Sequence, residues 1–146
     1  MSTVYIDVYR STHWELVQPT RASVDASSLD AINMAVLKGF EEVQDEGEPD
    51  LIVELIDLYL EDEPRKLASM LEAVAEADEM SLMRAAHSLK GSSASLGAFG
   101  VAALCEELEH VSKADSFPSA GMLLNRLKRE SARVRRAFAA ERRRRL

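Results

Sequence analysis

Residues 87–98 read HSLKGSSASLGA, a segment in which a histidine precedes a lysine and a glycine at helical spacing. Lys90 follows His87 by three residues and Gly91 follows it by four, and side chains at these spacings share one face of a helix. The ammonium group of Lys90 can offset the charge of an anion at the imidazole, and Gly91 leaves room for an incoming partner. A nucleophilic imidazole beside a cation suits an anionic group, and a phosphoryl group above all.

The helical wheel separates this segment into two faces. The apolar stripe of a helix over 81–96 consists of Leu82, Ala85, Ala86, Leu89, Ser93 and Leu96. His87 lies about 160° from Leu89 on the wheel, so it is expected to face away from the core. The residues within about 60° of it are Arg84, Lys90, Gly91 and Ala94.

His87 on this outer face is either an idle surface residue or an exposed reactive group. Glycine in a helix interior costs up to about 1 kcal/mol relative to alanine. An idle surface would have no reason to accept Gly91 at that cost. The segment therefore favours a reactive imidazole with a low-relief surface around it.

The elements that must position this segment are helical from residue 30 onward. DAINMAVLKGF is a short amphipathic segment, with Ser27 or Ser28 available as its N-cap. Pro49 suits the first turn of the next helix, in which the apolar residues Leu51, Leu55, Leu58 and Tyr59 repeat at helical spacing. Pro64 within that pattern predicts a kink or the end of one helix and the start of another.

The second half of the chain continues the helical pattern. Ser81 is the expected N-cap of the helix that carries His87, and Gly97 and Gly100 mark its end. Two further apolar stripes follow, Val101, Leu104, Cys105, Leu108 and Val111, then Leu123, Leu124, Leu127, Val134 and Phe138. Antiparallel helices joined by short loops predict an all-α fold, a four-helix bundle core with an additional N-terminal helix or extension. We expect an extension over 1–28, with VYIDVY as a strand or arm, a domain over 29–140 and a basic tail over 141–146.

Composition excludes several classes of function. A net charge of −7 disfavours nucleic acid as a partner, and no apolar run approaches membrane-spanning length. Cys105 is the single cysteine, so an intramolecular disulfide and a cysteine-rich metal site are excluded. No glycine-rich nucleotide loop is present, and His87 with His110 is too little for a zinc site. We expect a soluble, cytoplasmic protein.

The charges are unevenly distributed along the chain. Residues 41–63 hold eleven carboxylates and no lysine or arginine, whereas residues 126–146 hold ten basic residues and two acidic ones. One interpretation is a solvated acidic face and a basic tail. The other makes the terminal RRRRL a contact for an anionic surface, RNA or an acidic partner.

The histidine segment resembles the histidine-containing phosphotransfer (HPt) domain of multistep two-component signalling. The family pattern H-x-L-K-G-x-[SA]-x-x-[LIV]-G is matched at His87, Leu89, Lys90, Gly91, Ser93, Leu96 and Gly97. CEELE at 105–109 and LIVELIDLYLEDEPRKL at 51–67 resemble the flanking family segments, so the resemblance covers about 29–113 and extends toward 140. It implies a four-helix core whose exposed histidine accepts a phosphoryl group from the aspartyl phosphate of one receiver domain and passes it to an aspartate of another.

The resemblance also implies roles for individual residues. Neutral His87 is the nucleophile, through Nε2, while Lys90 offsets phosphoryl charge and Gly91 gives clearance. Glu109 stands at a family position that can bind the imidazole, where it would hold Nδ1–H and leave Nε2 free. The alternative is an exposed glutamate without a role. Lys113, one helical turn later, adds positive charge.

The same resemblance implies partners and a docking surface. The partners are response-regulator receivers and a hybrid sensor histidine kinase; the receiver supplies Mg²⁺, so the chain needs no cofactor of its own. Ile32, Val36 and Leu37 match a first-helix docking patch of related relay proteins, and bundle core is the alternative interpretation. Arg84 and Ala94 border His87 on the wheel and are added as partner-binding candidates. We expect a monomer, with Cys105 as a small buried hydrophobe.

Two rival functions remain open on the sequence. One is a helical adaptor that binds receivers without carrying phosphate. The other is the phosphoacceptor domain of a chemotaxis-type histidine kinase, separated from its parent. That domain would need dimerisation and ATP-binding regions beyond it, and the opening methionine and arginine-rich end favour a separate small protein.

Overall fold

The computed structural model describes residues 31–111 and 117–146, and these form helices joined by short turns. The elements are α3 (Met34–Val43), α4 (Leu51–Ala75), α5 (Glu79–Ser95), α6 (Phe99–Val111), the 3₁₀ turn η1 (Phe117–Ser119) and α7 (Ala120–Arg145). No strand occurs within these ranges, so the predicted all-α fold is confirmed. The expected arm or strand within residues 1–28 lies outside the described residues.

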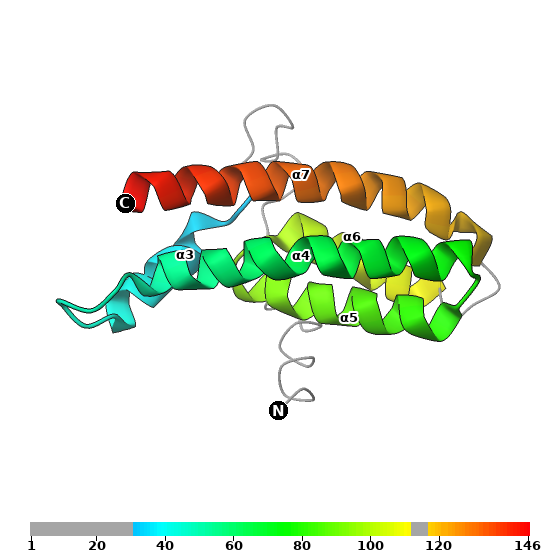
Figure 1. Cartoon of the computed structure of the whole chain (residues 1–146), viewed down its shortest axis with the longest axis horizontal. Helices are drawn as coiled ribbons and strands as arrows, with labels where there is room; N and C mark the ends of the chain where they lie inside the picture. Colours follow the sequence, from blue (N-terminus) through cyan, green and yellow to red (C-terminus); the bar gives the residue numbers. More distant parts are fainter. Residues whose placement is uncertain (1–30, 112–116) are drawn as a thin grey trace. The chain divides into compact units, whose positions relative to one another are not determined.

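The four helices α4 to α7 form an antiparallel bundle. α4 packs against α5 and α7, and α6 packs against the same two helices from the other side. Figure 1 shows consecutive helices running in opposite directions, with α3 beside the beginning of α4. The predicted four-helix core with one additional N-terminal helix is therefore confirmed. This order places α5 and α7 at opposite corners of the bundle.

Acidic and amide side chains begin the helices where serines were expected. Asn33 caps α3, and its Oδ1 accepts a hydrogen bond from the backbone N–H of Ala35 at 3.0 Å. Asp78 caps α5 and accepts bonds from the N–H and the hydroxyl of Ser81 at 3.1 and 2.7 Å. The predicted cap at Ser81 is wrong, because α5 starts earlier than the hydrophobic pattern suggested. The expected cap at Ser27 or Ser28 lies outside the described residues.

α4 continues through Pro64 as one helix of 25 residues. The predicted end of one helix and start of another at Pro64 is wrong, although proline removes a backbone donor and crowds the preceding turn. Ile56 and Tyr59 before the proline, and Leu67 and Met70 after it, are all buried on one face of α4. Burial of this continuous stripe against the bundle offsets the local cost of the proline.

The predicted apolar stripes form the core. Every inward residue expected on α7 is buried, as are the expected residues of α5 and α6 except the half-buried Ala85 and Val111. Cys105 is fully buried, which confirms its assignment as a small hydrophobe, and burial raises the pKa of its thiol. The sequence pattern thus identifies the face of α5, α6 and α7 that packs into the core.

Ion pairs join the C-terminal half of α7 to the N-terminal half of α4. Three arginines of α7 reach carboxylates at successive positions on α4, Arg135 with Glu63 at 3.7 Å, Arg142 with Asp57 at 2.6 Å and Arg145 with Asp50 at 3.3 Å. The pairs run in opposite chain directions on the two helices, as antiparallel packing requires. They favour one register of α7 on α4.

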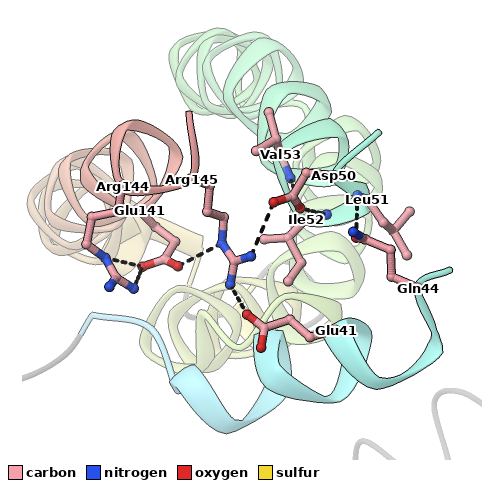
Figure 2. A network of polar contacts seen from close by, with 9 residues as sticks. All are labelled: Glu41, Gln44, Asp50, Leu51, Ile52, Val53, Glu141, Arg144 and Arg145. Carbon is pink, nitrogen blue, oxygen red and sulfur yellow. Dashed lines mark hydrogen bonds and ion pairs between the residues drawn. The ribbon is translucent and has the colours of Figure 1, made fainter. Parts of the chain in front are cut away.

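Arg145 anchors the end of α7 to the α3–α4 junction (Figure 2). Its guanidinium contacts Glu41 of α3, Asp50 at the start of α4 and Glu141 one turn earlier on α7. The segment expected as a separate basic tail over 141–146 is therefore the last turn of α7, and the boundary placed at 140 falls inside a helix. Long-range pairing of Arg145, at sequence separations of 95 and 104, explains why the helix continues.

Glu63 carries a carboxyl group into the core between α4 and α7. The residue is 1% exposed, and burial raises the pKa of its carboxyl. The hydroxyl of Ser131 and the guanidinium of Arg135 oppose that shift by favouring the ionised form. The free energy of unfolding is therefore coupled to the protonation of Glu63.

Candidate functional site

His87 lies on α5 with its imidazole 42% exposed and one ring nitrogen held by a carboxylate. Its Nδ1 is 2.7 Å from Oε2 of Glu109 on α6. A carboxylate accepts the Nδ1 proton, so the tautomer with an unprotonated Nε2 is favoured. This is the arrangement of a nucleophile whose ring is oriented by a fixed acceptor.

Glu109 is buried in the α5–α6 interface, with its side chain 5% exposed. The alternative expectation of an exposed, idle glutamate is therefore wrong. One carboxylate oxygen faces the imidazole of His87 and the other contacts Nζ of Lys90. The carboxylate thus joins the surface histidine to a charged group beneath it.

Lys90 does not share the solvent-facing surface of His87. The residue is 1% exposed, and its Nζ contacts Glu109 and lies 3.8 Å from Oε1 of Glu106. The helical wheel predicted an outward Lys90 because it gives only the direction of the Cα–Cβ bond and not the position of the ammonium group. The flexible four-carbon stem instead carries the ammonium group inward, toward the two carboxylates of α6. Lys90 therefore supports Glu109 and has no exposed face with which to contact a bound phosphoryl group.

The turn between α5 and α6 sets the distance between His87 and Glu109. Gly97 adopts φ +86°, a left-handed conformation that glycine enters without strain. Its carbonyl accepts the backbone N–H of Asn33 at 2.8 Å, so the same turn also holds the start of α3. A Cβ at Gly97 would lie 2.7 Å from the carbonyl oxygen of Asn33. The close approach of α3 requires glycine here.

The remaining residues predicted around His87 lie in different environments. Arg84 is exposed one turn before His87, so it can reach a partner that approaches the imidazole. Gly91 and Ala94 are half-buried on the turns after it. Lys113 lies outside the described residues.

The predicted docking patch on α3 is only partly on the surface. Ile32 is 2% exposed and Leu37 is fully buried, so neither side chain can meet a partner, and their assignment to a docking surface is wrong. Both belong to the core that holds α3 on the bundle, which was the alternative interpretation. Val36 is half-buried.

An apolar hollow that the sequence did not reveal lies between α3, α4 and α5. It has a volume of about 410 Å³, and its lining includes Phe40, Leu55, Leu58, Ser92 and Ser95. Ser92 and Ser95 follow His87 on the same helix, and Leu58 is 65% exposed. The apolar repeat of α4 suggested that Leu58 faces the core. The sequence signal that could have distinguished Leu58 from the core residues of α4 was its position next to Asp57 on the polar side of that helix.

Metal and membrane sites are absent from the described part of the chain. Residues 31–111 and 117–146 contain no group of three or more histidine, cysteine or acidic side chains placed to bind a metal ion. None of the helices in these ranges has the length and apolar content needed to cross a bilayer.

The described residues form a helical bundle in which a buried carboxylate orients the surface histidine His87. A family model described as the Hpt domain matches residues 54–137, more than half of the chain. The chain therefore belongs to the Hpt domain family, and the predicted resemblance is confirmed.

Named relatives agree with this membership. The chain is 32% identical over 78 residues to histidine-containing phosphotransfer protein 2 of Arabidopsis thaliana, covering 51% of this chain and 50% of the plant protein. It thus spans about half the length of that curated relative.

Two solved structures share the fold. Histidine-containing phosphotransfer protein B (HptB) from Pseudomonas aeruginosa PAO1 has a TM-score of 0.73 and 32% identity, over 80% of this chain and 98% of its own. Histidine-containing phosphotransfer protein MtHPt2 from Medicago truncatula has a TM-score of 0.66 over 94% of this chain and 95% of its own. At 20% sequence identity, the similarity to the Medicago truncatula structure shows a shared fold and nothing more.

Proposed function

We propose that this chain relays a phosphoryl group between receiver-domain aspartates through a phosphohistidine at His87. The observation that carries the proposal is the 2.7 Å contact between Nδ1 of His87 and Glu109 beneath a 42% exposed imidazole. A buried carboxylate fixes the tautomer, and the free Nε2 faces an approaching partner. The names of the relatives support the same activity.

The transfer requires one bond to form and one to break. The Nε2 lone pair of His87 attacks the phosphorus of an aspartyl phosphate, and the P–O bond to the aspartate breaks as its carboxylate leaves. The Nδ1 proton stays on the ring, where Glu109 balances the positive charge that develops on the imidazole. The reverse step passes the phosphoryl group to an aspartate of a second receiver. The chain itself supplies the nucleophile and its orientation, and the receiver supplies Mg²⁺.

We assign the donor and acceptor to response-regulator receivers and a hybrid sensor kinase in the cytoplasm, with the chain acting as a monomer. The hollow supports this docking, because it offers exposed apolar surface whose α5 lining, including Ser92 and Ser95, follows His87 on the same helix. Leu58 is a better docking candidate than the buried Ile32 and Leu37. Arg84 adds a cation on the same face of α5.

The test is phosphotransfer from a receiver carrying a radiolabelled aspartyl phosphate to the full chain. We expect acid-labile label on the wild type and none on a His87→Gln variant. His110→Gln is the matched control, because His110 is an exposed histidine on α6 and its loss should leave labelling unchanged. Full labelling of His87→Gln would overturn the assignment. Receiver binding without any labelling of the wild type would favour the adaptor function instead.

The role of Glu109 has a separate test in the same assay. Glu109→Gln keeps an acceptor for Nδ1–H, whereas Glu109→Leu removes it. A hydrogen bond to a charged group contributes about 1.5–3 kcal/mol, so the leucine variant should transfer about 10- to 100-fold more slowly than wild type. The glutamine variant should lie between them. Equal rates for all three proteins would show that Glu109 does not orient the imidazole.

A further inference from the structure

The basic residues of α7 fall into two groups that the sequence does not separate. Arg135, Arg142 and Arg145 point to carboxylates of α4 and α3, and Figure 2 shows how Arg145 is enclosed by acidic side chains. Arg144 pairs with Glu141 on its own helix. These arginines are used within the fold, so the terminal RRRRL is not a free basic tail.

A second group of arginines forms a stripe on the outer side of α7. We call this group the cationic stripe; its members are the four exposed residues Arg126, Arg129, Arg136 and Arg143. At 100° per residue they lie within about 100° of one another on the wheel, and they extend about 26 Å along the helix. Arg133 and Ala140 lie within the same sector. Among the described residues, no carboxylate lies within ion-pair distance of any of the four stripe arginines.

This stripe lies away from the histidine. α7 packs against α4 and α6, whereas α5 occupies the opposite corner of the bundle. A partner on the stripe would therefore leave His87 open to a second protein. Within the part of the chain that the structure describes, the four guanidinium groups have no carboxylate partner, whereas the other α7 arginines are largely paired in a chain whose net charge is −7.

We propose that the cationic stripe is a docking surface for an acidic helix of a partner protein. A helix laid along α7 has the same rise of 1.5 Å per residue, so carboxylates repeating every three or four residues can meet successive arginines over the full length. Guanidinium groups pair with carboxylates in a bidentate geometry that fixes register. The stripe alone carries these contacts, independently of the reaction at His87.

The flanks of the stripe favour a narrow protein helix over a broad polyanion. α4 lies beside α7 and carries the carboxylates Asp57 and Glu61, whose side chains remain 48% and 66% exposed although Arg142 and Arg65 pair with them. A nucleic acid duplex or an anionic membrane would extend beyond α7 and meet these carboxylates. A single helix can contact the arginines and avoid them.

The probe is a fluorescent, alanine-based helical peptide of about 21 residues with glutamates on one face at three- and four-residue spacing. Its control has the same composition with the glutamates distributed around the helix. We expect the one-faced peptide to bind about tenfold more tightly, with an affinity that falls as salt rises. Equal affinity for both peptides would overturn the proposal.

Charge reversal locates the binding on the protein. R129E/R136E should lose binding of the one-faced peptide, while K38E/K128E, which changes the net charge equally at two exposed lysines, should retain it. Loss of binding in both variants would mean that net charge alone acts, and would overturn the stripe. Tighter binding of duplex DNA or anionic vesicles through the same arginines would overturn the assigned partner.

Phosphoryl transfer to His87 separates this inference from the proposed function. R129E/R136E should accept the phosphoryl group from a receiver at the wild-type rate, because neither arginine lies near α5. His87→Gln should bind the peptide as wild type does. A loss of peptide binding in His87→Gln would place the peptide at the histidine face and overturn the stripe as its site.

Discussion

Replacement of Lys90 by methionine tests whether the lysine supports the site from within the bundle. Lys90 is 1% exposed and its ammonium group contacts Glu109, whose side chain is 5% exposed. Methionine has a similar length and no charge. The variant therefore leaves the shape of the interface nearly intact and leaves the carboxylate of Glu109 without its buried cation.

The expected loss of stability follows from that burial. Removing one partner of a buried ion pair costs about 3–5 kcal/mol, because the remaining charge stays out of water without its counter-charge. The hydrogen bond from His87 to the other carboxylate oxygen remains, so the loss should lie toward the lower end of that range. Unfolding of a domain of this size in urea has a slope of about 2 kcal/mol per M, so the midpoint should fall by about 1.5–2.5 M. An exposed pair such as Arg65–Glu61, with side chains 72% and 66% exposed, should contribute far less.

The measurement is urea unfolding of the wild type, Lys90→Met, Glu109→Gln and the double variant, followed by circular dichroism. The double variant buries neither charge, so its loss should be smaller than the sum of the two single losses by about 1–3 kcal/mol. Arg65→Met is the surface control. A loss below about 1 kcal/mol for Lys90→Met, or additive losses in the cycle, would refute the buried pair.

The rate of phosphoryl transfer, measured at a urea concentration that leaves every variant folded, distinguishes a Lys90 that acts through Glu109 from a Lys90 that contacts the phosphoryl group. If Lys90 acts only through Glu109, adding Lys90→Met to Glu109→Leu should lower the transfer rate no further. A further large loss in the combined variant would show that the lysine reaches the phosphoryl group. Folding of each variant under assay conditions is checked by the same circular dichroism signal.

Three further predictions address the frame around the site. Burial raises the pKa of Glu63, so the folded state favours the protonated carboxyl, and the free energy of unfolding falls as pH rises through the folded-state pKa. Glu63→Gln should therefore gain stability relative to wild type as pH rises from acid to neutral, measured by urea unfolding. A stability difference that does not change with pH would contradict this. Gly97→Ala should lower stability by about 1–3 kcal/mol in thermal unfolding, because φ is +86° and the new Cβ meets Asn33; an unchanged midpoint would exclude the close approach. Tyr59→Phe should cost about 1–2 kcal/mol by leaving the buried Ser93 hydroxyl without its 2.8 Å partner, and Ser93→Ala in the same chain should recover part of that loss.

The sequence predicts the histidine helix well because its geometry is local. The stripe from Leu82 to Leu96 and the outward direction of His87 both follow from helical periodicity, which depends on backbone geometry alone. The caps were harder to predict, since Asp78 and Ser81 are both good cap residues three positions apart. Only the tertiary position of the helix decides between them.

The errors arise where a side chain or a helix end depends on distant residues. The ammonium group of Lys90 points inward because it pairs with Glu106 and Glu109 on the next helix. A helical wheel of α5 alone does not include these carboxylates. The last turn of α7 is held by Glu41 and Asp50, about a hundred residues away in the chain, so its sequence alone resembles a solvated tail. Burial of Leu37 likewise depends on how α3 is packed.

The pairing of His87 with Glu109 spans 22 residues within one helical hairpin. Closing a loop of this length costs less chain entropy than the pairings of Arg145, which span 95 and 104 residues. The nucleophile and its carboxylate are therefore aligned by α5, α6 and the turn at Gly97, without help from α3 or α7. Substitutions on those outer helices can therefore change the surface offered to a partner while the orientation of the imidazole stays the same.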